Sequence, residues 1–572
     1  MIGSARVASF ALMATVMTVP SPGQVLHRLP GDGGDALFLV WTMRWVNHAA
    51  VHGWTALWRP NIFAGNGLTL AYSDTLLPLA PVFGLLSWLT RSPALAFNLL
   101  SVAAWTLSLW ATDRLARRVL GSPAASIVAA TAFTFSTMRL AQYRHLQLAF
   151  GCLLPLALLL LLRLLERPTI RGGLAFGALA ATITLIASYY GIALLLCAAV
   201  VVTVHQLVER DGGWRAWSKS LAAAASVYLV AIGPVAWQYL RLERDPSFRR
   251  APDPTFFSHW SDFRAVSLDN RFVGHWWPVA GQALTKSGEN WLFPGYVTSV
   301  LAVLGIFAFA RRRALRNGEL GVLAAAGGVL LVLSFGSWMT VGGHRIPLPY
   351  AALGSLPGLA GIRVPARFTV VPMLVVALLA GLGLASILRR CGRVVVAVVC
   401  VAITGAMLLE SAIRVETVPI EPTADGAAVN HELSRRPDGV VLELPALSQA
   451  SGAAWTFVEA PREVASTIDW KPRVNGVSGF EPGPGFGALV ATLNRFPAPV
   501  SWPVLDRMRV RYVVLRLTIP VDIGERRAEY ERPGVGVLSD AEAHGIIASL
   551  PADRVRSVAR VGSAYLIELV GA

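Results

Sequence analysis

The sequence predicts an all-α polytopic membrane protein with about eleven membrane-spanning helices, followed by a C-terminal mixed α/β domain outside the cytoplasm. Composition and charge distribution predict this fold class. The chain is 54% hydrophobic and only 15% charged, whereas soluble domains carry about 25% charged residues. Its 572 residues also exceed the size of about 250–300 residues at which a single soluble core stops growing. Lipid is therefore the solvent that accommodates the apolar surface.

The membrane-spanning helices are predicted from the length of the apolar runs. A helix rises about 1.5 Å per residue, so about 20 apolar residues cross a hydrocarbon core of about 30 Å. Such runs are 5–21, 97–113, 123–139, 146–164, 172–188, 190–208, 219–239, 294–310, 319–337, 368–388 and 394–412. The stretch 75–90 is shorter and carries two prolines, so we expect it to lie at the interface or to re-enter without crossing.

Orientation follows from arginine-rich connections, which occur after every second run. Short basic loops face the cytoplasm, so we expect a cytoplasmic N-terminus in the inner (plasma) membrane. The predicted domains are then a membrane module at 1–412, with large outer loops at 22–96 and 240–293, and an extracytoplasmic domain at 413–572. Much of the basic surplus behind the net charge of +16 falls in the short basic loops, and no nucleic-acid partner is expected.

The tail changes character from apolar runs to strand patterns. Gly439–Leu444 alternates before a proline, and Val510–Leu517 and Ala564–Leu569 are rich in β-branched and aliphatic residues. These patterns predict strands. Helical stretches between them indicate a mixed α/β domain.

The first outer loop contains an amphipathic pattern at Asp35–Val51. Leu37, Trp41, Trp45 and His48 recur at helical spacing. This spacing predicts a helix that lies in the membrane interface with its tryptophans at headgroup depth.

Two carboxylates, Asp32 and Asp35, stand three residues apart at the N-terminus of this helix. Acidic residues beside membrane spans are costly and are therefore functional candidates. Asp35 can be a helix N-cap that accepts a hydrogen bond from the first turn. Alternatively, a carboxylate placed here can act as a general base on a bound hydroxyl or hold a cation.

The sequence resembles the GT-C glycosyltransferases, and most closely a bacterial branch of that class. The shared marks are Gly-Asp-x-x-Asp at Gly31–Asp35 with Trp41 and Trp45 after it, Arg144-His145-Leu146, Phe293–Tyr296, Arg363–Phe368, Pro472–Phe480 and Met508–Leu515. Each mark alone is weak, but together they cover most of the chain.

The resemblance implies transfer of a hexose or pentose from a polyprenyl-phosphate donor, with membrane lipids around the site, to an extracytoplasmic acceptor in the cell envelope, either a glycan, a lipid or a protein. In the inverting form of the reaction, a carboxylate near the end of the first span deprotonates the acceptor and the lipid phosphate leaves. We assign the base to Asp35 first and Asp32 second. The resemblance is compatible both with a reaction that uses a divalent metal ion, Mg²⁺ or Mn²⁺, and with one that uses none.

Arginines that run against the charge rule are candidates for binding the leaving phosphate. Arg363 and Arg367 lie on an expected outer loop, and arginine matches phosphate oxygens bidentately. Their other interpretation is contact with lipid headgroups at the flank of a span. Arg144 and His145 lie on another outer loop, where His145 can donate to the phosphate or contact the sugar, or simply be solvated.

Three further residues are weaker candidates for substrate binding. Asp74 and Glu289 lie in expected outer loops, where they can contact the acceptor or a metal, although solvated loop residues are the more common case. Tyr189 can stack on a sugar or anchor in the aromatic belt.

Other classes of protein are disfavoured by what the sequence lacks. It contains no P-loop, zinc HExxH or nucleophile elbow, and its cytoplasmic connections are too short for a nucleotide-binding domain. A membrane transporter or flippase for a lipid-linked precursor is the main alternative, and it predicts matching halves, which we do not find. A noncatalytic scaffold, which predicts a filled first loop, is the third.

Overall fold

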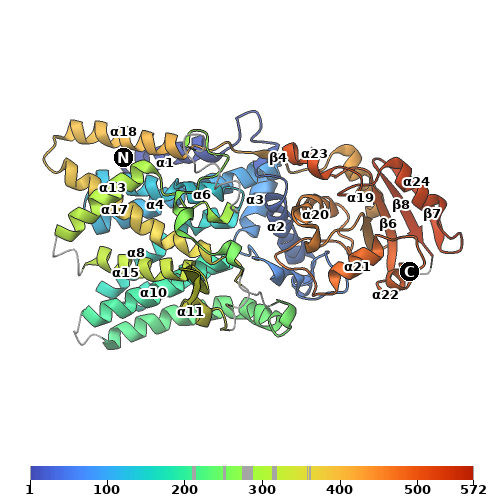
Figure 1. Cartoon of the computed structure of the whole chain (residues 1–572), viewed down its shortest axis with the longest axis horizontal. Coiled ribbons are helices and arrows are strands. Elements are labelled where there is room, and N and C mark those ends of the chain that lie inside the picture. The colour runs from blue at the N-terminus through green and yellow to red at the C-terminus, as the bar shows by residue number, and fades with distance from the viewer. Residues whose placement is uncertain are drawn as a thin grey trace. The chain divides into compact units, whose positions relative to one another are not determined.

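The computed structural model of the chain describes residues 2–208, 214–248, 253–273, 288–311, 318–356, 359 and 362–570. They form two compact units, whose elements are labelled in Figure 1. The first unit contains residues 1–19 and 101–415, and the second contains residues 20–100 and 416–572. The first outer loop thus groups with the tail, whereas the predicted domain division at residue 412 kept that loop with the membrane module. That division stays a prediction.

The first unit is built mainly of helices. They are α1 (Ile2–Thr18), α4 (Pro93–Leu120, shared with the second unit), α5 (Pro123–Thr134), α6 (Thr137–Ala141), α7 (Leu146–Ala149), α8 (Leu153–Glu166), α9 (Ile170–Ile186), α10 (Ser188–Val208), α11 (Trp214–Leu242), α13 (Tyr296–Arg311), α15 (Glu319–Ser334), α16 (Tyr350–Leu353), α17 (Val370–Leu388) and α18 (Arg393–Ser411). A small antiparallel hairpin joins β2 (Trp338–Val341) to β3 (His344–Pro347).

Seven helices of the described chain are long and apolar enough to cross a membrane: Pro93–Leu120, Pro123–Ala141, Leu146–Glu166, Ser188–Leu207, Trp217–Leu242, Pro365–Leu388 and Arg393–Ser411. Ser4–Thr18, Ile170–Ile186, Tyr296–Arg311 and Glu319–Ser334 are shorter apolar helices that coincide with the remaining predicted runs. The chain is therefore an integral membrane protein, while the count of eleven spans stays a prediction.

Glycines allow close packing between pairs of these helices. A side chain on Gly383 of α17 would place its Cβ 2.0 Å from the carbonyl oxygen of Leu301 in α13, and Gly305 of α13 meets the Leu379 carbonyl at 1.9 Å. Such small-residue contacts are typical of helix association in lipid, where backbones approach closely. The helices α13 and α17 therefore pack backbone to backbone.

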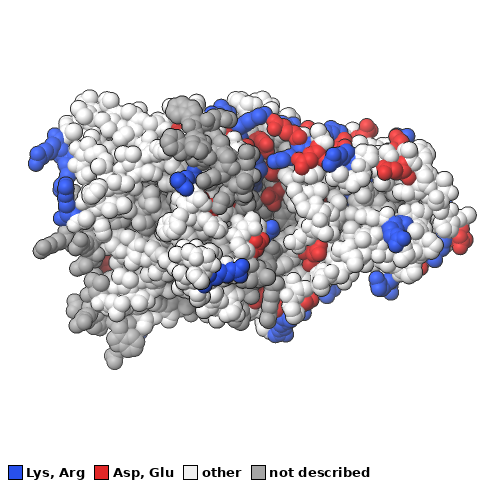
Figure 2. All heavy atoms as spheres, in the orientation of Figure 1, with Lys and Arg blue, Asp and Glu red and all other residues white. Residues whose placement is uncertain are grey.

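The outer faces of the first unit are apolar. Val394 and Val401 of α18 and Leu229 and Val230 of α11 are strongly exposed. The view in Figure 2 shows a largely uncharged surface over the helices of this unit. An exposed apolar face of this kind is what a lipid environment requires.

The second unit combines two parts of the chain that are far apart in sequence. Strand β1 (Arg28–Pro30) pairs antiparallel with β4 (Thr417–Pro419). Helices α2 (Asp35–His52) and α3 (Ala80–Thr90) come from the first outer loop. The tail contributes α19 (Ala424–Ser434), α20 (Ala453–Ser466), α21 (Phe486–Leu493), α22 (Trp502–Arg507), α23 (Arg527–Tyr530) and α24 (Asp540–Ala548).

A four-stranded sheet in the order β5-β6-β8-β7 organises the tail (Figure 1). Strand β5 (Val440–Leu444) is parallel to β6 (Val510–Arg516), which pairs antiparallel with β8 (Ala564–Leu569), and β8 pairs antiparallel with β7 (Val555–Val561). The three predicted strands coincide with β5, β6 and β8. The core between α19 and the sheet contains Val429, Leu433, Val441, Tyr512, Val514, Ala564 and Leu566.

Helix α2 corrects one prediction about the first outer loop. Trp41 is 1% and Trp45 5% exposed, so the tryptophans face protein rather than lipid headgroups. Instead, the indole of Trp41 donates to Asn61 Oδ1 at 3.2 Å, and that of Trp45 donates to the Leu57 carbonyl at 2.9 Å. The prediction was wrong because α2 packs against α20 of the tail, which covers the face assigned to the membrane. Helix α3 has 11 residues and is about 16 Å long, too short to cross a bilayer.

Candidate functional site

The first candidate carboxylate, Asp32, lies in a tight turn between β1 and α2. The backbone N–H of Gly31 donates to the Glu416 carbonyl at 3.0 Å, which ties the start of the turn to the tail. The side chain of Asp32 is only 7% exposed, and its Oδ1 accepts the backbone N–H of Gly34 at 3.2 Å. The turn therefore holds a carboxylate in a largely buried position.

Glycine is required in this turn because the tail approaches it closely. Gly33 has a φ of +81°, a left-handed conformation that side chains disfavour, and a Cβ there would lie 2.8 Å from Ile523 Cγ2. A Cβ on Gly34 would lie 3.0 Å from Thr456 Cγ2 and 3.4 Å from Phe457 Cε1. Residues of the tail thus form one wall of the acidic turn.

The second candidate carboxylate, Asp35, is the first residue of α2 and is half-buried. Gly34 occupies the N-cap position, and no side chain provides the cap hydrogen bond. The N-cap interpretation of Asp35 was therefore wrong. A negative charge in the first turn is still favoured by the helix dipole. Asp74 is also half-buried and lies in the same unit, between the short helix Thr69–Tyr72 and α3.

The charge of Asp32 contributes to the pKa of a tyrosine in the tail, Tyr530. Tyr530 stacks on Phe457 with ring centroids 5.0 Å apart and planes 9° apart. Burial and the negative charges of Glu529 and Asp32 together raise the pKa of Tyr530 to about 12, against the opposing charge of Arg526. Sequence reasoning missed Tyr530, Phe457 and Ile523, because no local pattern signals a contact with a turn more than 400 residues away.

The tail also holds the loop that follows α2. The backbone N–H of Arg473 donates to the Asn61 carbonyl at 2.9 Å, and the N–H of Ala64 donates to the Arg473 carbonyl at 2.7 Å. Asn61 Nδ2 donates in turn to Ser466 Oγ at 2.9 Å. These bonds connect the motif Pro472–Phe480 to the first outer loop, so that loop and tail form one body.

Within the first unit, the structure brings Glu289 and Arg367 together. Arg367 Nε lies 3.0 Å from Glu289 Oε2, and a second guanidinium nitrogen bonds to Glu289 Oε1. Both side chains are mostly buried. Gln142 Nε2 donates to Glu289 Oε2 at 3.3 Å. This bidentate geometry is the strong form of an ion pair and neutralises most of the charge on Arg367.

Tyr189 connects the two arginines that were predicted to bind phosphate. Its hydroxyl accepts the backbone N–H of Arg363 at 2.9 Å, and its ring lies 4.7 Å from the guanidinium carbon of Arg367. The exposed guanidinium of Arg363 lies 4.5 Å from the centre of the Phe256 ring. Arg363 forms no ion pair with any residue of the described ranges.

The predicted residues Arg144 and His145 lie on a loop beside this cluster. Arg144 pairs with Asp269 at 3.1 Å, a partner that no sequence pattern singled out. His145 is half-buried and stands at the N-terminus of α7. Gln142, three residues earlier, connects this loop to Glu289. The structure thus gathers Tyr189, Glu289, Arg363 and Arg367 with the 142–145 loop, while Asp32, Asp35 and Asp74 belong to the second unit.

The candidate ligands for a metal ion are the carboxylates of the acidic turn. Across the residues that the structure describes, no three His, Cys, Asp or Glu side chains gather as a metal site. Asp32 and Asp35 supply two carboxylates of the oxygen type that Mg²⁺ and Mn²⁺ prefer. The Mg²⁺ or Mn²⁺ prediction therefore stays a prediction.

Solved structures with the same architecture are glycosyltransferases. The arabinofuranosyltransferase AftD from Mycobacteria matches with a TM-score of 0.60 and 15% identity, covering 100% of this chain and 40% of that chain. The Archaeoglobus fulgidus oligosaccharyltransferase matches with a TM-score of 0.53 and 11% identity over 89% of this chain and 69% of that chain. The chain spans about two fifths of the AftD chain. These likenesses show that the chain has the GT-C fold.

Comparison by sequence gives a family and no described relative. A search of curated proteins found no match. One family model matches residues 22–405, which is about two-thirds of the chain and includes both the acidic turn and the Arg363 cluster. The chain therefore belongs to the family described as Domain of unknown function (DUF6311).

Proposed function

We propose that the chain is an inverting glycosyltransferase that moves a sugar from a polyprenyl-phosphate donor to an acceptor outside the cytoplasm. One observation carries the proposal: two carboxylates, Asp32 and Asp35, stand at the start of α2 in a chain with the GT-C fold. Asp32 is buried in a turn that the tail encloses, and Asp35 is half-buried. A reaction that needs a positioned base requires such a rigid carboxylate.

In this mechanism Asp35 accepts the proton of the acceptor hydroxyl. The oxygen then bonds to the anomeric carbon as the bond from that carbon to the phosphate oxygen breaks. The phosphate leaves on the lipid with the electron pair. Asp35 is the first choice because its side chain is more exposed than that of Asp32, and a general base must reach its substrate within hydrogen-bond distance.

The leaving phosphate needs positive charge, and the Arg363 cluster supports that role. Arg363 is exposed and stacks on Phe256, so a phosphate can reach its guanidinium. Arg367 is paired with Glu289 and serves better to position Tyr189, which in turn holds the backbone of Arg363. We therefore assign the phosphate contact to Arg363 and a supporting role to Arg367.

The proposal includes a membrane topology. Eleven spans with a cytoplasmic N-terminus in the plasma membrane would place the first outer loop and the tail outside the cytoplasm. Arg389 and Arg390 between α17 and α18, together with Arg393 at the start of α18, support a cytoplasmic connection there. The bond network between the tail and residues 61–64 supports their location on the same side.

The test is sugar transfer by membranes that contain single variants of the full chain. Asp35→Asn should lower transfer from polyprenyl-phosphate sugars by about a hundredfold or more, in line with loss of a general base. Asp32→Asn should lower it less, and Asp553→Asn, on an exposed loop, should leave it unchanged. Wild-type rates for both Asp35→Asn and Asp32→Asn would eliminate the proposed base. Movement of the lipid donor across the membrane without transfer would indicate a flippase instead.

A further inference from the structure

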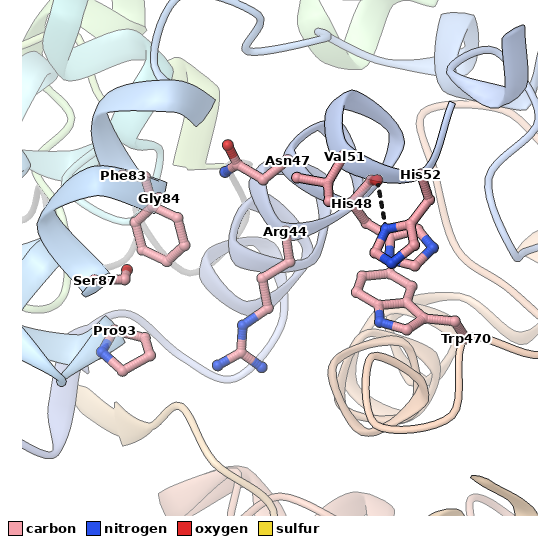
Figure 3. A pocket seen from close by; sticks show the side chains of 10 residues that line it. All are labelled: Arg44, Asn47, His48, Val51, His52, Phe83, Gly84, Ser87, Pro93 and Trp470. Atoms are coloured by element: carbon pink, nitrogen blue, oxygen red, sulfur yellow. Dashed lines mark hydrogen bonds between the residues drawn. The ribbon is translucent and has the colours of Figure 1, made fainter. Parts of the chain in front are cut away.

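The second unit contains a cavity of about 320 Å³ between α2, α3 and the tail. Its lining is almost entirely carbon, with a few polar groups, and a volume of this size suits a small ligand or part of a larger one. Figure 3 shows Phe83, Ser87 and Pro93 on one side of Arg44, and His48, His52 and Trp470 on the other.

One wall of the cavity is a stack of three flat rings. His48 lies between His52 and Trp470, with ring centroids 4.1 Å from each (Figure 3). Burial lowers the pKa of His48, and the neighbouring His52 lowers it further. The lowered pKa favours the neutral form of His48, and the stacked rings offer a flat surface to an apolar chain.

Two polar groups of the cavity are suited to an acidic head. The buried hydroxyl oxygen of Ser87 has no hydrogen-bond partner among the described residues. The guanidinium of Arg44 donates to Glu421 at 2.6 Å and to Thr467 at 3.2 Å. Glu421 is more than half exposed, and a surface ion pair of this kind is weak. A phosphate can therefore replace Glu421 at Arg44 at little cost.

The outer face of α3 is apolar and exposed. Val82, Leu85, Trp88 and Leu89 are all between 44% and 75% exposed, while Phe83 and Ser87 on the other face line the cavity. Contiguous exposed apolar surface marks contact with a membrane or a partner. An apolar chain in the cavity would be continuous with this surface.

We propose that this cavity binds a membrane lipid with a phosphate head, its hydrocarbon chain between Phe83 and Trp470 and its phosphate at Arg44 and Ser87. The site uses residues of the second unit only and requires no glycosyl transfer, so it stands apart from the proposed function. The occupant is a lipid rather than free phosphate, because the lining is mostly apolar and a bare anion gains nothing from it.

The experiment is native mass spectrometry of the delipidated full chain with three probes: dioleoyl-phosphatidylglycerol, dioleoylglycerol and inorganic phosphate. The wild type should retain phosphatidylglycerol in a saturable manner and bind it at least tenfold more tightly than dioleoylglycerol. Arg44→Gln and Ser87→Leu should each weaken phosphatidylglycerol binding by about tenfold, as expected for loss of a charge-assisted or buried hydrogen bond. Arg495→Gln, an exposed arginine remote from the cavity lining, is the matched control.

The outcomes separate the alternatives. Equal binding of phosphatidylglycerol by the wild type, Arg44→Gln and Ser87→Leu overturns the site, provided that the variants melt at the wild-type temperature. Equal affinity for dioleoylglycerol shows that the phosphate is not recognised and also overturns it. If inorganic phosphate binds as tightly as the lipid, the cavity is a phosphate site and the lipid assignment is wrong. If one variant melts below the wild-type temperature, the other one decides the test, because Ser87→Leu and Arg44→Gln alter different walls of the cavity.

Discussion

Arg473 and Glu443 face each other inside the second unit, with Arg473 Nε 2.9 Å from Glu443 Oε1 and both side chains fully buried. Arg516 Nε reaches the other carboxylate oxygen at 2.7 Å. Burial raises the pKa of Glu443, but the charges of Arg516 and Arg473 outweigh it and hold that pKa at about 2. The backbone of Arg473 also forms hydrogen bonds with Asn61 and Ala64. This ion pair therefore lies where the tail is hydrogen-bonded to the first outer loop.

The first prediction concerns this ion pair. Arg473→Met should lower the free energy of unfolding of the second unit by about 3–5 kcal/mol, because it leaves Glu443 and Asp469 buried beside an apolar side chain. Thermal unfolding of the detergent-solubilised chain measures the change. Arg435→Met, which removes an exposed arginine, should unfold at the wild-type temperature. Equal midpoints for both variants would show that the buried pair contributes nothing.

The second prediction concerns a buried acid on α20. Burial raises the pKa of Glu463 well above its ordinary value, and Glu459 raises it further while the Val477 N–H lowers it. The folded state therefore binds the Glu463 proton more tightly than the unfolded state does. Wild-type stability should fall as the pH rises above about 4.5, until the folded-state pKa is passed.

Glu463→Gln removes this pH dependence. Its melting temperature should rise relative to the wild type as the pH is raised from 5 to 9. Glu542→Gln at an exposed capping box is the control of opposite sign, because the Ser539 hydrogen bonds lower the pKa of Glu542. That substitution costs stability above about pH 4.5, and the cost disappears as the pH falls. A pH-independent difference between Glu463→Gln and the wild type would contradict the prediction.

Local elements could be predicted from the sequence because their patterns are local. The run 368–388 and the helix α17 (Val370–Leu388) agree closely, as do the strand prediction Ala564–Leu569 and β8. Strand β7 was missed, because its alternating burial is carried by arginines and small residues rather than by a clear apolar pattern. Hydrophobic periodicity and composition identify a helix or a strand, but they do not show which other helices or strands it packs against.

The contacts that build the sites could not be predicted, because they join distant residues. Glu289 and Arg367 were each singled out, yet 78 residues separate them and their pairing has no local signature. Asn61 and Ser466 are 405 residues apart. The tryptophans of α2 were assigned to the membrane interface for the same reason, since the apolar stripe on a helix does not reveal whether lipid or α20 covers it.

The third prediction tests the phosphate role of Arg363. Arg363→Ala should weaken binding of a polyprenyl phosphate by about tenfold or more, as expected for a lost charge-assisted hydrogen bond. Arg345→Ala is the matched control, because Arg345 is also exposed and stacks over an aromatic ring, that of Trp338, at 5.0 Å. Titration of the lipid phosphate into the purified chain gives both affinities. If the two variants bind alike, Arg363 holds no phosphate.

The last prediction concerns the turn that holds Asp32. Gly33→Ala should destabilise this turn by about 1–3 kcal/mol, because an alanine with φ near +81° is strained and its Cβ meets Ile523. If Asp32 and Asp35 act in sugar transfer, the same substitution should lower the transfer rate. The loss of rate should exceed the loss of folded protein at the assay temperature, which the melting curve gives. The double variant Gly33→Ala with Ile523→Ala should recover part of the rate, since it removes the clash and leaves only the backbone strain. Full wild-type activity in Gly33→Ala would mean that the geometry of the turn, and with it the wall that the tail provides, is irrelevant to the chemistry.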